Sequence, residues 1–421
     1  MASQSPAADP DVSKCENVNK SEHAAKKIAQ SPNPARTASC RSAIDSFIVM
    51  DVMSRAAARE AAGHRVIHME VGQPATPAPA IARDAAKAAI DSQALGYTLA
   101  LGSAPLRERI ARHYQTTYGV AISPERIVVT TGSSAAFVLA FLALFDVGAH
   151  VALPQPGYPC YRHILTALGQ HPLAIETNAA TRWMPTPEAI AALADTAGGL
   201  QGVLIASPAN PTGTMLQPER MKAIAQLCDE RGIWFISDEI YHGLTYGQPA
   251  KTALSYSDSA IVINSFSKYF SMTGWRIGWM IVPEFLVRPI ERLAQNLYIA
   301  PPAVSQVAAA ASFDATKELQ KNVAGYAQNR ELLLEGLPKV GFHDIVPADG
   351  AFYLYCNVSH LTDDSLAFAN EMLAEIGVAA TPGIDFDPER GTTYLRFSYA
   401  GSIDDMREAL RRLASWKRLR S

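Results

Sequence analysis

The sequence contains few cysteines, and they form no recognisable pairs. Five are scattered over 421 residues, with no CxxC spacing and an odd total: Cys15, Cys40, Cys160, Cys228 and Cys356. Disulfide frameworks and zinc sites usually show even numbers or close spacing of cysteines. The pattern predicts reduced thiols in a cytoplasmic protein, and it offers no candidate metal site.

Long hydrophobic runs and a strong charge of either sign are also absent. The longest apolar run, Ala135 to Phe145, is too short for a membrane span, which needs about 20 residues. The formal net charge of −3 gives no reason to expect a nucleic acid or an anionic membrane as partner. Hydrophobic residues make up 48% of the chain, so a substantial core is expected.

The first forty residues differ from the rest of the chain. They are rich in Ser, Ala, Pro, Asn and charges, and they lack hydrophobic periodicity. We predict that residues 1–40 form a disordered extension. They contain no apolar segment typical of a secretory signal, and their acidic residues argue against a transit peptide.

Short apolar segments then alternate with longer helical stretches. The predicted strands are 126–130, 151–153, 202–206, 233–237, 261–264 and 277–281, and the predicted helices include 134–145. Continuous apolar strands are typical of a sheet that is covered on both faces. The sequence therefore predicts an α/β fold with a mainly parallel sheet flanked by helices. The segment 277–281 follows its predecessor too closely for a crossover helix, so its direction stays open.

The pattern changes after Pro301 to amphipathic helices with a few alternating strands, such as 350–355 and 393–398. A last helix is predicted after the capping pattern that begins at Ser402. We expect a large domain over 75–300 and a smaller C-terminal α+β domain over 301–421. Residues 41–74 are expected to form an N-terminal arm and part of the small domain.

Lys268 is the residue with the clearest chemical context. It follows a short buried strand and stands near Ser265, Ser267 and Arg276. A poorly solvated lysine has a lowered pKa and an accessible neutral amine. Hydroxyls and a guanidinium are groups that hold a phosphate. An amine beside a phosphate site suggests a Schiff base to pyridoxal 5'-phosphate (PLP).

Other polar residues follow the remaining predicted strands. They are Gly132, Ser133, Ser134, Tyr158, Asn210, Asp238 and Tyr241. Ligands of open α/β sheets bind beyond the carboxyl ends of the strands. We therefore expect these residues to meet Lys268 at one edge of the sheet.

Four motifs occur in order along the chain: SPANPTG from residue 207, SDEIY from 237, NSFSKYFSMTGWRIGW from 264 and LRFS from 395. On these motifs the chain resembles the class I/II aminotransferases, a PLP-dependent fold-type I family of the aspartate aminotransferase-like superfamily, over roughly residues 41 to 421. The resemblance implies an enzyme that moves the α-amino group of an amino acid to a 2-oxo acid. It implies a Schiff base on Lys268 and ketimine and pyridoxamine intermediates.

The resemblance also implies roles around the cofactor. Lys268 would be the catalytic base and acid, and Asp238 would pair with the pyridinium nitrogen. Tyr241 and Asn210 would hydrogen-bond the phenolic oxygen, and Tyr158 would stack on the ring. The phosphate would be held by Gly132, Ser133, Ser134, Ser265 and Arg276.

Substrate binding is implied for three residues and dimer formation for one. Arg396 would clamp the α-carboxylate, with Asn210 and the amide of Gly72 assisting. Tyr97 matches the family position that reaches the phosphate of the neighbouring subunit, which implies a homodimer.

Substrate choice is where the chain departs from the aspartate-specific pattern. Aspartate-type relatives often carry a lysine at the position of Ser134. The serine shifts the expectation to a neutral or aromatic amino acid, with 2-oxoglutarate or pyruvate as acceptor. Arg41 or Arg55 of the arm could still supply the missing charge, so aspartate aminotransferase activity stays open.

Two further alternatives remain from the residues alone. One is another PLP reaction, such as a C–S β-lyase. The other is a non-enzymatic PLP-binding regulator, for which the first forty residues are too short and not basic enough to supply a DNA-binding domain. Glu239, His242 and His163 are interpreted as structural residues, and Cys160 as a passive thiol.

Overall fold

The computed structural model describes residues 38–196 and 199–419. Almost all of the predicted extension 1–40 lies outside these residues. The main sheet has seven strands, ordered β2-β8-β7-β6-β5-β3-β4. Their bounds are β2 (Ile127–Thr130), β3 (His150–Gln155), β4 (His171–Glu176), β5 (Gly202–Ala206), β6 (Trp234–Asp238), β7 (Ile261–Ser265) and β8 (Gly278–Ile281).

The sheet is mostly parallel, as predicted, and β8 is its one antiparallel member. β8 runs antiparallel to both β2 and β7, which decides the direction that the sequence left open. The connection from β7 to β8 is too short for a crossover helix and therefore returns the chain in the opposite sense. The edge strand β4 was not predicted, because only Ile175 of its six residues is buried, so it lacks the continuous apolar pattern of the inner strands.

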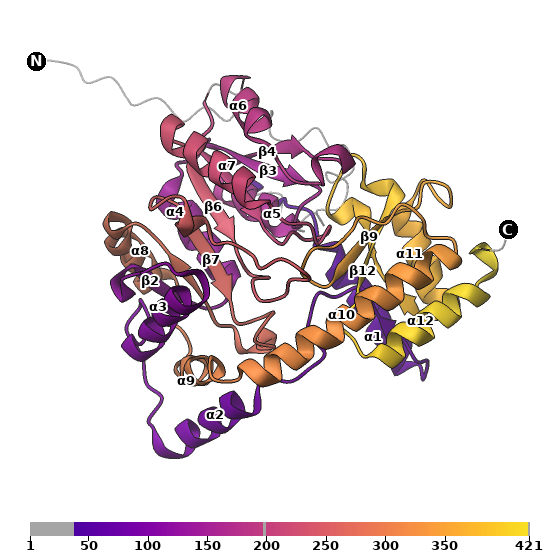
Figure 1. Ribbon diagram of the computed structural model, residues 1–421, viewed down its shortest axis with the longest axis horizontal. Helices are drawn as coiled ribbons and strands as arrows, with labels where there is room; N and C mark the ends of the chain where they lie inside the picture. The colour runs from indigo at the N-terminus through magenta and orange to yellow at the C-terminus, as the bar shows by residue number, and fades with distance from the viewer. Residues whose placement is uncertain (1–37, 197–198, 420–421) are drawn as a thin grey trace, which may run out of the picture.

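Consecutive strand residues point to opposite faces of the sheet, and each face has its own apolar core. Val129, Val203 and Ile205 belong to one core cluster, whereas Val128 and Leu204 belong to the other. One face is covered by α3 (Ala104–Tyr118), α6 (Pro187–Thr196), α7 (Pro218–Arg231) and α9 (Ala303–Ser312), with α2 (Ala80–Ser92) packed on α9. The other face is covered by α4 (Ser133–Leu144), α5 (Pro159–Leu168) and α8 (Glu284–Leu297). Figure 1 shows this helix–sheet–helix arrangement.

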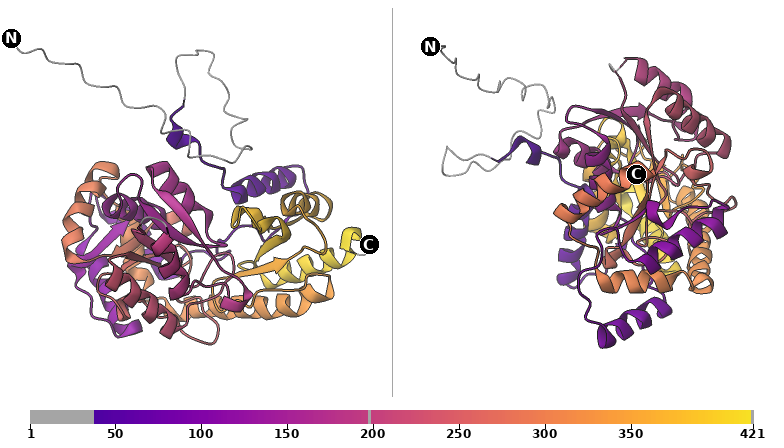
Figure 2. Two further views of the ribbon diagram at one scale, coloured as in Figure 1. Left: turned by 90° about the horizontal axis from the view of Figure 1, so that it is seen from above. Right: turned by 90° about the vertical axis from the view of Figure 1, so that its left-hand side faces the viewer.

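A separate core is built mainly from the last quarter of the chain. It includes an antiparallel sheet with the order β11-β12-β9 and a small parallel pair, β1-β10. The elements are β1 (Ile67–His68), β9 (Tyr353–Asn357), β10 (Val378–Ala379), β11 (Thr381–Pro382), β12 (Tyr394–Ser398), α1 (Ile48–Ala61), α10 (Thr316–Lys339), α11 (Ser365–Ile376) and α12 (Ile403–Ser415). The left view of Figure 2 shows this part beside the main sheet.

The early segment around β1 joins this second core, since Ile67 and Met69 pack among its residues. α10 links the two cores: Leu319 lies in a core of the main sheet and Leu333 lies in the second core. The first observation agrees with placing 41–74 in the smaller unit, whereas α9 and the start of α10, both after residue 301, pack on the main sheet. The division into 41–74, 75–300 and 301–421 stays a proposal. Within the described residues, no helix is both long and apolar enough to cross a bilayer.

One strand begins three residues later than predicted. The segment 350–355 was expected to be extended throughout, but β9 begins only at Tyr353. Ala351 has a left-handed φ of 58°, which interrupts the extended backbone before that point.

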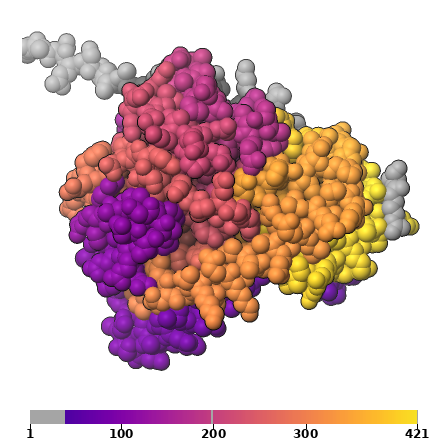
Figure 3. Space-filling model, viewed as in Figure 1, coloured from indigo at the N-terminus to yellow at the C-terminus, as the bar shows by residue number. Residues whose placement is uncertain are grey.

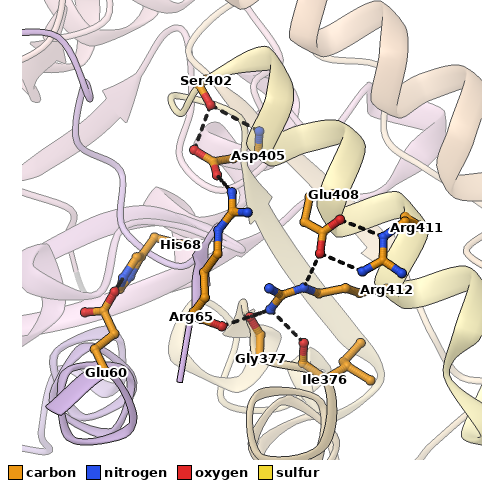
Figure 4. A network of polar contacts seen from close by, with 10 residues as sticks. All are labelled: Glu60, Arg65, His68, Ile376, Gly377, Ser402, Asp405, Glu408, Arg411 and Arg412. Carbon is orange, nitrogen blue, oxygen red and sulfur yellow. Dashed lines mark hydrogen bonds and ion pairs between the residues drawn. The ribbon is translucent and has the colours of Figure 1, made fainter. Parts of the chain in front are cut away.

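A polar network holds α12 against the ends of neighbouring elements (Figure 4). Ser402 caps the helix by accepting from the Asp405 backbone N–H at 3.1 Å, as predicted. Arg412 donates to the carbonyls of Ile376 and Gly377, both at 3.0 Å. These carbonyls lie at the end of α11, where a helix leaves acceptors unpaired. The network therefore fixes α12 to α11 at that end.

Candidate active site

The residues predicted at the strand ends do lie along one edge of the main sheet. Asp238 is the last residue of β6 and pairs in register with Ala206, the last residue of β5. Asn210 follows β5 by four residues, and Lys268 follows β7 by three. Because β5, β6 and β7 are parallel, their carboxyl ends bring these side chains to the same edge.

Lys268 faces the other charged groups of the site. Its amine donates a hydrogen bond to the carbonyl of Gly72 and lies 5.8 Å from the centre of the Tyr241 ring. Burial lowers the pKa of Lys268 to about 8, and the positive charges of Arg396 and Arg276 act in the same direction. Asp238 opposes this effect. A lysine with this pKa carries a substantial neutral fraction near neutral pH.

Asp238 is buried and hydrogen-bonded on both oxygens. The Tyr161 hydroxyl donates to Oδ2, and the backbone N–H of Ile240 donates to Oδ1 at 3.0 Å. Burial raises the pKa of Asp238 to about 6, while the two hydrogen bonds and the charge of Lys268 oppose the rise. Tyr161 was not predicted from the sequence. Its signal is its spacing, three residues after Tyr158, which places both on one side of α5.

Arg396 is buried between two aromatic rings. Its guanidinium carbon lies 4.3 Å from the centre of the Tyr353 ring and 4.7 Å from that of Phe386. Nη1 donates to Asn210 Oδ1 at 2.8 Å, and Nη2 donates to the carbonyl of Glu70. Contacts on both faces and along the edge fix the plane of the guanidinium.

Tyr353 contacts Tyr241, Arg396 and Gly72, but the sequence did not predict it as a site residue. Its hydroxyl is 2.6 Å from that of Tyr241. A Cβ at Gly72 would lie only 1.7 Å from the same hydroxyl, so this position requires glycine. Tyr353 lies in β9, more than 100 residues from Tyr241, and in the sequence it reads as an ordinary strand aromatic. Only the tertiary fold brings it to the site.

A second group of residues forms a cradle at the start of α4. Gly132 is the N-cap, has a φ of +80° and provides no side chain to satisfy the first N–H groups of the helix. A Cβ at Gly132 would lie 2.5 Å from Nη2 of Arg276, so the guanidinium rests directly against this glycine. Ser265 lies nearby on β7, with its hydroxyl 2.8 Å from that of Ser267. Free N–H groups, hydroxyls and a guanidinium are suited to an anion such as a phosphate.

Tyr158 lies near Asp238 and packs edge-to-face against the rings of Tyr161 and Phe47. Its ring centre is 5.2 Å from that of Tyr161 at 77°, and 5.7 Å from that of Phe47. Asp238 contributes to raising the pKa of Tyr158, which burial raises most. Tyr158 is therefore placed to contact a ring bound near Asp238.

Four other residues named in the sequence analysis are not brought into contact with Lys268, Asp238 or Arg396 within the described part of this chain. Tyr97 is 85% exposed. Ser134 is exposed in the first turn of α4. Arg55 hydrogen-bonds Asn370, and Arg41 lies on a short 3-10 helix near Gly169. Neither arginine supplies a second positive charge beside Arg396 in this structure.

Comparison with known proteins agrees with this geometry. Residues 64–413 match the family described as Aminotransferase class I and II. The chain belongs to this family, which confirms the resemblance, and it is an aminotransferase of the fold-type I class. Members of the family use PLP as a general property.

The relatives include a valine–pyruvate aminotransferase from Mycobacterium tuberculosis. It is 48% identical over 380 residues, which cover 89% of this chain and 97% of the relative. A crystal structure of an aminotransferase from Mycobacterium tuberculosis has a TM-score of 0.88 and 48% identity, covering 90% of this chain and 99% of that one. The aspartate aminotransferase of Thermus thermophilus with maleate has a TM-score of 0.85 at 28% identity, with coverages of 90% and 99%. The mainly parallel α/β fold is thereby confirmed.

Proposed function

We propose that this aminotransferase binds PLP through Lys268 and moves the α-amino group of a neutral amino acid to a 2-oxo acid. The observation that carries the proposal is the position of the Lys268 amine. The amine follows β7, donates to the carbonyl of Gly72 and lies 5.8 Å from the centre of the Tyr241 ring. Burial lowers its pKa to about 8. PLP, when bound, supplies an aldehyde that condenses with amines and a ring that withdraws electrons from the reacting carbon.

The residues present fit this cofactor. The cradle of Gly132, Ser133, Ser134, Ser265 and Arg276 would hold the phosphate. Gly132 leaves the space that a Cβ would fill, and the helix start supplies free N–H groups. Asp238 would hold a proton on the ring nitrogen, because a buried carboxylate beside a cation favours its charged form. Tyr158 would lie against the ring, and Tyr241 and Asn210 would meet its phenolic oxygen.

Lys268 is the group we assign to proton transfer. Its Nζ would take the proton from the substrate Cα and deliver it to the C4′ carbon of the cofactor. A base works best when its pKa is near the working pH, and about 8 satisfies this condition. The carbonyl of Gly72 accepts a hydrogen bond from the same nitrogen and orients it.

Arg396 is assigned to the substrate α-carboxylate, assisted by Asn210 and the amide of Gly72. Tyr353 and Phe386 fix the guanidinium plane, so two parallel N–H groups are presented in one orientation. A planar fork of this kind matches a carboxylate in a bidentate manner.

A neutral amino donor with pyruvate as acceptor is the substrate pair we favour. Ser134 provides no positive charge for a second carboxylate, and Arg41 and Arg55 have other contacts in this chain. The relative from Mycobacterium tuberculosis that shares 48% identity is named for valine and pyruvate. The aspartate aminotransferase from Thermus thermophilus shares only 28%.

We propose in addition that the enzyme is a homodimer. Tyr97 is 85% exposed and Leu99 is 70% exposed, on the segment between α2 and α3. Exposed large apolar residues on one segment are typical of a surface covered by a partner. Tyr97 would then reach the phosphate cradle of a second copy. Measurement of the native mass by light scattering tests this arrangement directly.

The experiment for the enzymatic proposal is a panel of amino donors against 2-oxo acids, with half-reactions followed by cofactor absorbance. Valine and other neutral donors should react faster than aspartate, and a pyridoxamine form with a paired 2-oxo acid product should appear. Product ammonia in place of that pair would indicate β-elimination. Faster reaction of aspartate than of any neutral donor would reject the substrate assignment.

Lys268→Ala isolates the catalytic residue. The variant should lose the borohydride-reducible adduct and at least about 10³-fold in rate, in line with the loss of general acid–base catalysis. Lys251→Ala, at an exposed position, is the matched control and should keep both. A reducible lysine adduct that persists in Lys268→Ala would show that another lysine binds the cofactor.

A further inference from the structure

A cavity lies apart from the candidate active site, between α3 and the start of α10. Its volume is about 430 Å³, within the range of about 300–1,000 Å³ that is usual for small-molecule sites. Two of its lining residues, His242 and Tyr269, directly follow Tyr241 and Lys268 in the chain. None of the residues assigned to cofactor or substrate lines it. Figure 3 shows the face where α3, in purple, lies near α10, in orange.

The lining of this cavity carries a net positive charge. α3 presents Arg109, Arg112 and His113 at helical spacing on one face. Asp314 is the only acid among the lining residues, all of which are described, and it pairs with Arg109 at 2.5 Å. Arg112 is thereby left as a positive charge without a counter-charge in the cavity wall. Burial lowers the pKa of His113 to about 4, so this ring is neutral at physiological pH.

Much of the remaining wall is aromatic, and Thr116, Thr117, Asn264, Thr316 and Gln320 add polar groups to it. Phe313 and Phe270 lie with ring centres 5.1 Å apart, and Tyr269 and Phe270 lie 5.0 Å apart. Tyr118 and Trp279 line the cavity as well. Such a wall favours a flat apolar body, while the arginines favour an anionic head group.

We propose that this cavity binds an aromatic monocarboxylate, with the carboxylate at Arg112 and the ring against the Phe270–Phe313 wall. An amino acid fits less well, because its ammonium group would need a carboxylate partner. Asp314 is the acid in the lining, and it already forms an ion pair with Arg109. A phosphate fits less well, because it would leave the aromatic wall uncovered.

Hydrogen bonds connect the cavity to the active site. The Tyr118 hydroxyl is 2.8 Å from Nδ1 of His242, and Nε2 of His242 is 3.1 Å from the carbonyl of Ser207. Ser207 begins the turn that carries Asn210, the partner of Arg396. A ligand that displaces Tyr118 or His242 would therefore shift the turn that positions the substrate-binding arginine. We expect it to inhibit without competing with the amino donor, an expectation that rests on the aminotransferase activity.

Calorimetric titration of the PLP-loaded, full-length enzyme with 3-phenylpropionate tests the site. This probe has the required carboxylate and ring but is neither an amino acid nor a 2-oxo acid. Arg112→Gln should weaken its binding by about tenfold or more, the usual effect of losing a charged hydrogen bond. Thr117→Trp, which fills the cavity, should weaken it as well. Arg288→Gln, at an exposed position of α8, should leave it unchanged.

Arg396→Gln separates this cavity from the active site. Binding at the cavity should persist in that variant, because Arg396 does not line it. Loss of all binding in Arg396→Gln, or unchanged binding in both Arg112→Gln and Thr117→Trp, would overturn the proposal. So would the absence of binding at millimolar probe. Equal affinity for inorganic phosphate would overturn the ligand class. Since the readout is heat of binding, a failure here is distinguishable from a failure of the proposed substrate pair.

Discussion

The hydroxyl of Tyr161 donates a hydrogen bond to Oδ2 of Asp238, although 77 residues separate them in the chain. The bond crosses from α5 to the end of β6, inside the core of the main sheet. It places a neutral donor against a buried carboxylate whose pKa is raised to about 6. A donor to the charged form lowers an acid's pKa, so Tyr161 limits the effect of burial on Asp238.

Tyr161→Phe should therefore raise the pKa of Asp238 above its present value. The acidic limb of the pH profile of kcat/KM should move to higher pH by about 1 unit or more, because a hydrogen bond to a charged group contributes about 1.5–3 kcal/mol. Tyr246→Phe is the matched control, since the Tyr246 hydroxyl donates to the carbonyl of Ala351 outside this pair. An acidic limb that stays in place in Tyr161→Phe would mean that Asp238 does not govern it.

Arg396→Gln tests the carboxylate clamp. Removing the guanidinium should raise KM for amino donors by about 10- to 100-fold, corresponding to a lost charged hydrogen bond, with a smaller change in kcat. Arg396→Lys keeps the charge but loses the planar fork, so its KM should lie between that of the wild type and that of Arg396→Gln. Arg407→Gln removes an arginine that is 65% exposed and pairs with Asp404, and it should leave KM unchanged. An unchanged KM in Arg396→Gln, with normal folding, would remove Arg396 from the substrate site.

His68 provides a prediction about stability. Its Nδ1 is 2.8 Å from Glu70 Oε1, and its Nε2 is 3.1 Å from Glu60 Oε1. Figure 4 shows His68 beside Glu60. The hydrogen bond to Glu70 chiefly raises the pKa of His68, to about 9. A raised histidine pKa stabilises the fold fully below the unfolded value of 6.5, and this contribution is lost as the pH rises through 9.

His68→Gln should consequently lower the free energy of unfolding at pH 6 and have much less effect at pH 10. The side chain is 40% exposed, so solvent screening limits the loss to about 1–2 kcal/mol. Urea denaturation of the wild type and the variant at both pH values measures the difference. A loss of equal size at both pH values would attribute it to packing and not to charge.

The main sheet and the strand-end residues could be predicted because their signals are local. Apolar runs such as 261–264 are continuous along the chain, and Lys268 and Asp238 follow their strands directly. Tyr353 and Phe386 could not be found in this way, since their roles depend on contact with Arg396 across the fold. The direction of β8 likewise depends on its pairing partners, β2 and β7, and not on its own residues.

Ser134 is the residue on which substrate choice is expected to depend. It is exposed in the first turn of α4, within the cradle that we propose to hold the phosphate. Ser134→Lys would add a positive charge at the position expected to meet the second carboxylate of aspartate, and it should raise kcat/KM for aspartate relative to valine by about tenfold or more. Ser415→Lys adds the same charge at an exposed position on α12 and should change neither rate.

The rates of Ser134→Lys with aspartate and with valine distinguish two roles of position 134, contact with the substrate side chain and contact with the cofactor phosphate. A cation that meets the second carboxylate of aspartate changes only the ratio between aspartate and valine. A serine that instead helps to hold the phosphate would, when replaced, weaken cofactor binding and reduce both rates together. Titration of PLP into the variant, with absorbance as the readout, therefore belongs beside the kinetics. An altered ratio with unchanged cofactor affinity would place Ser134 next to the substrate side chain.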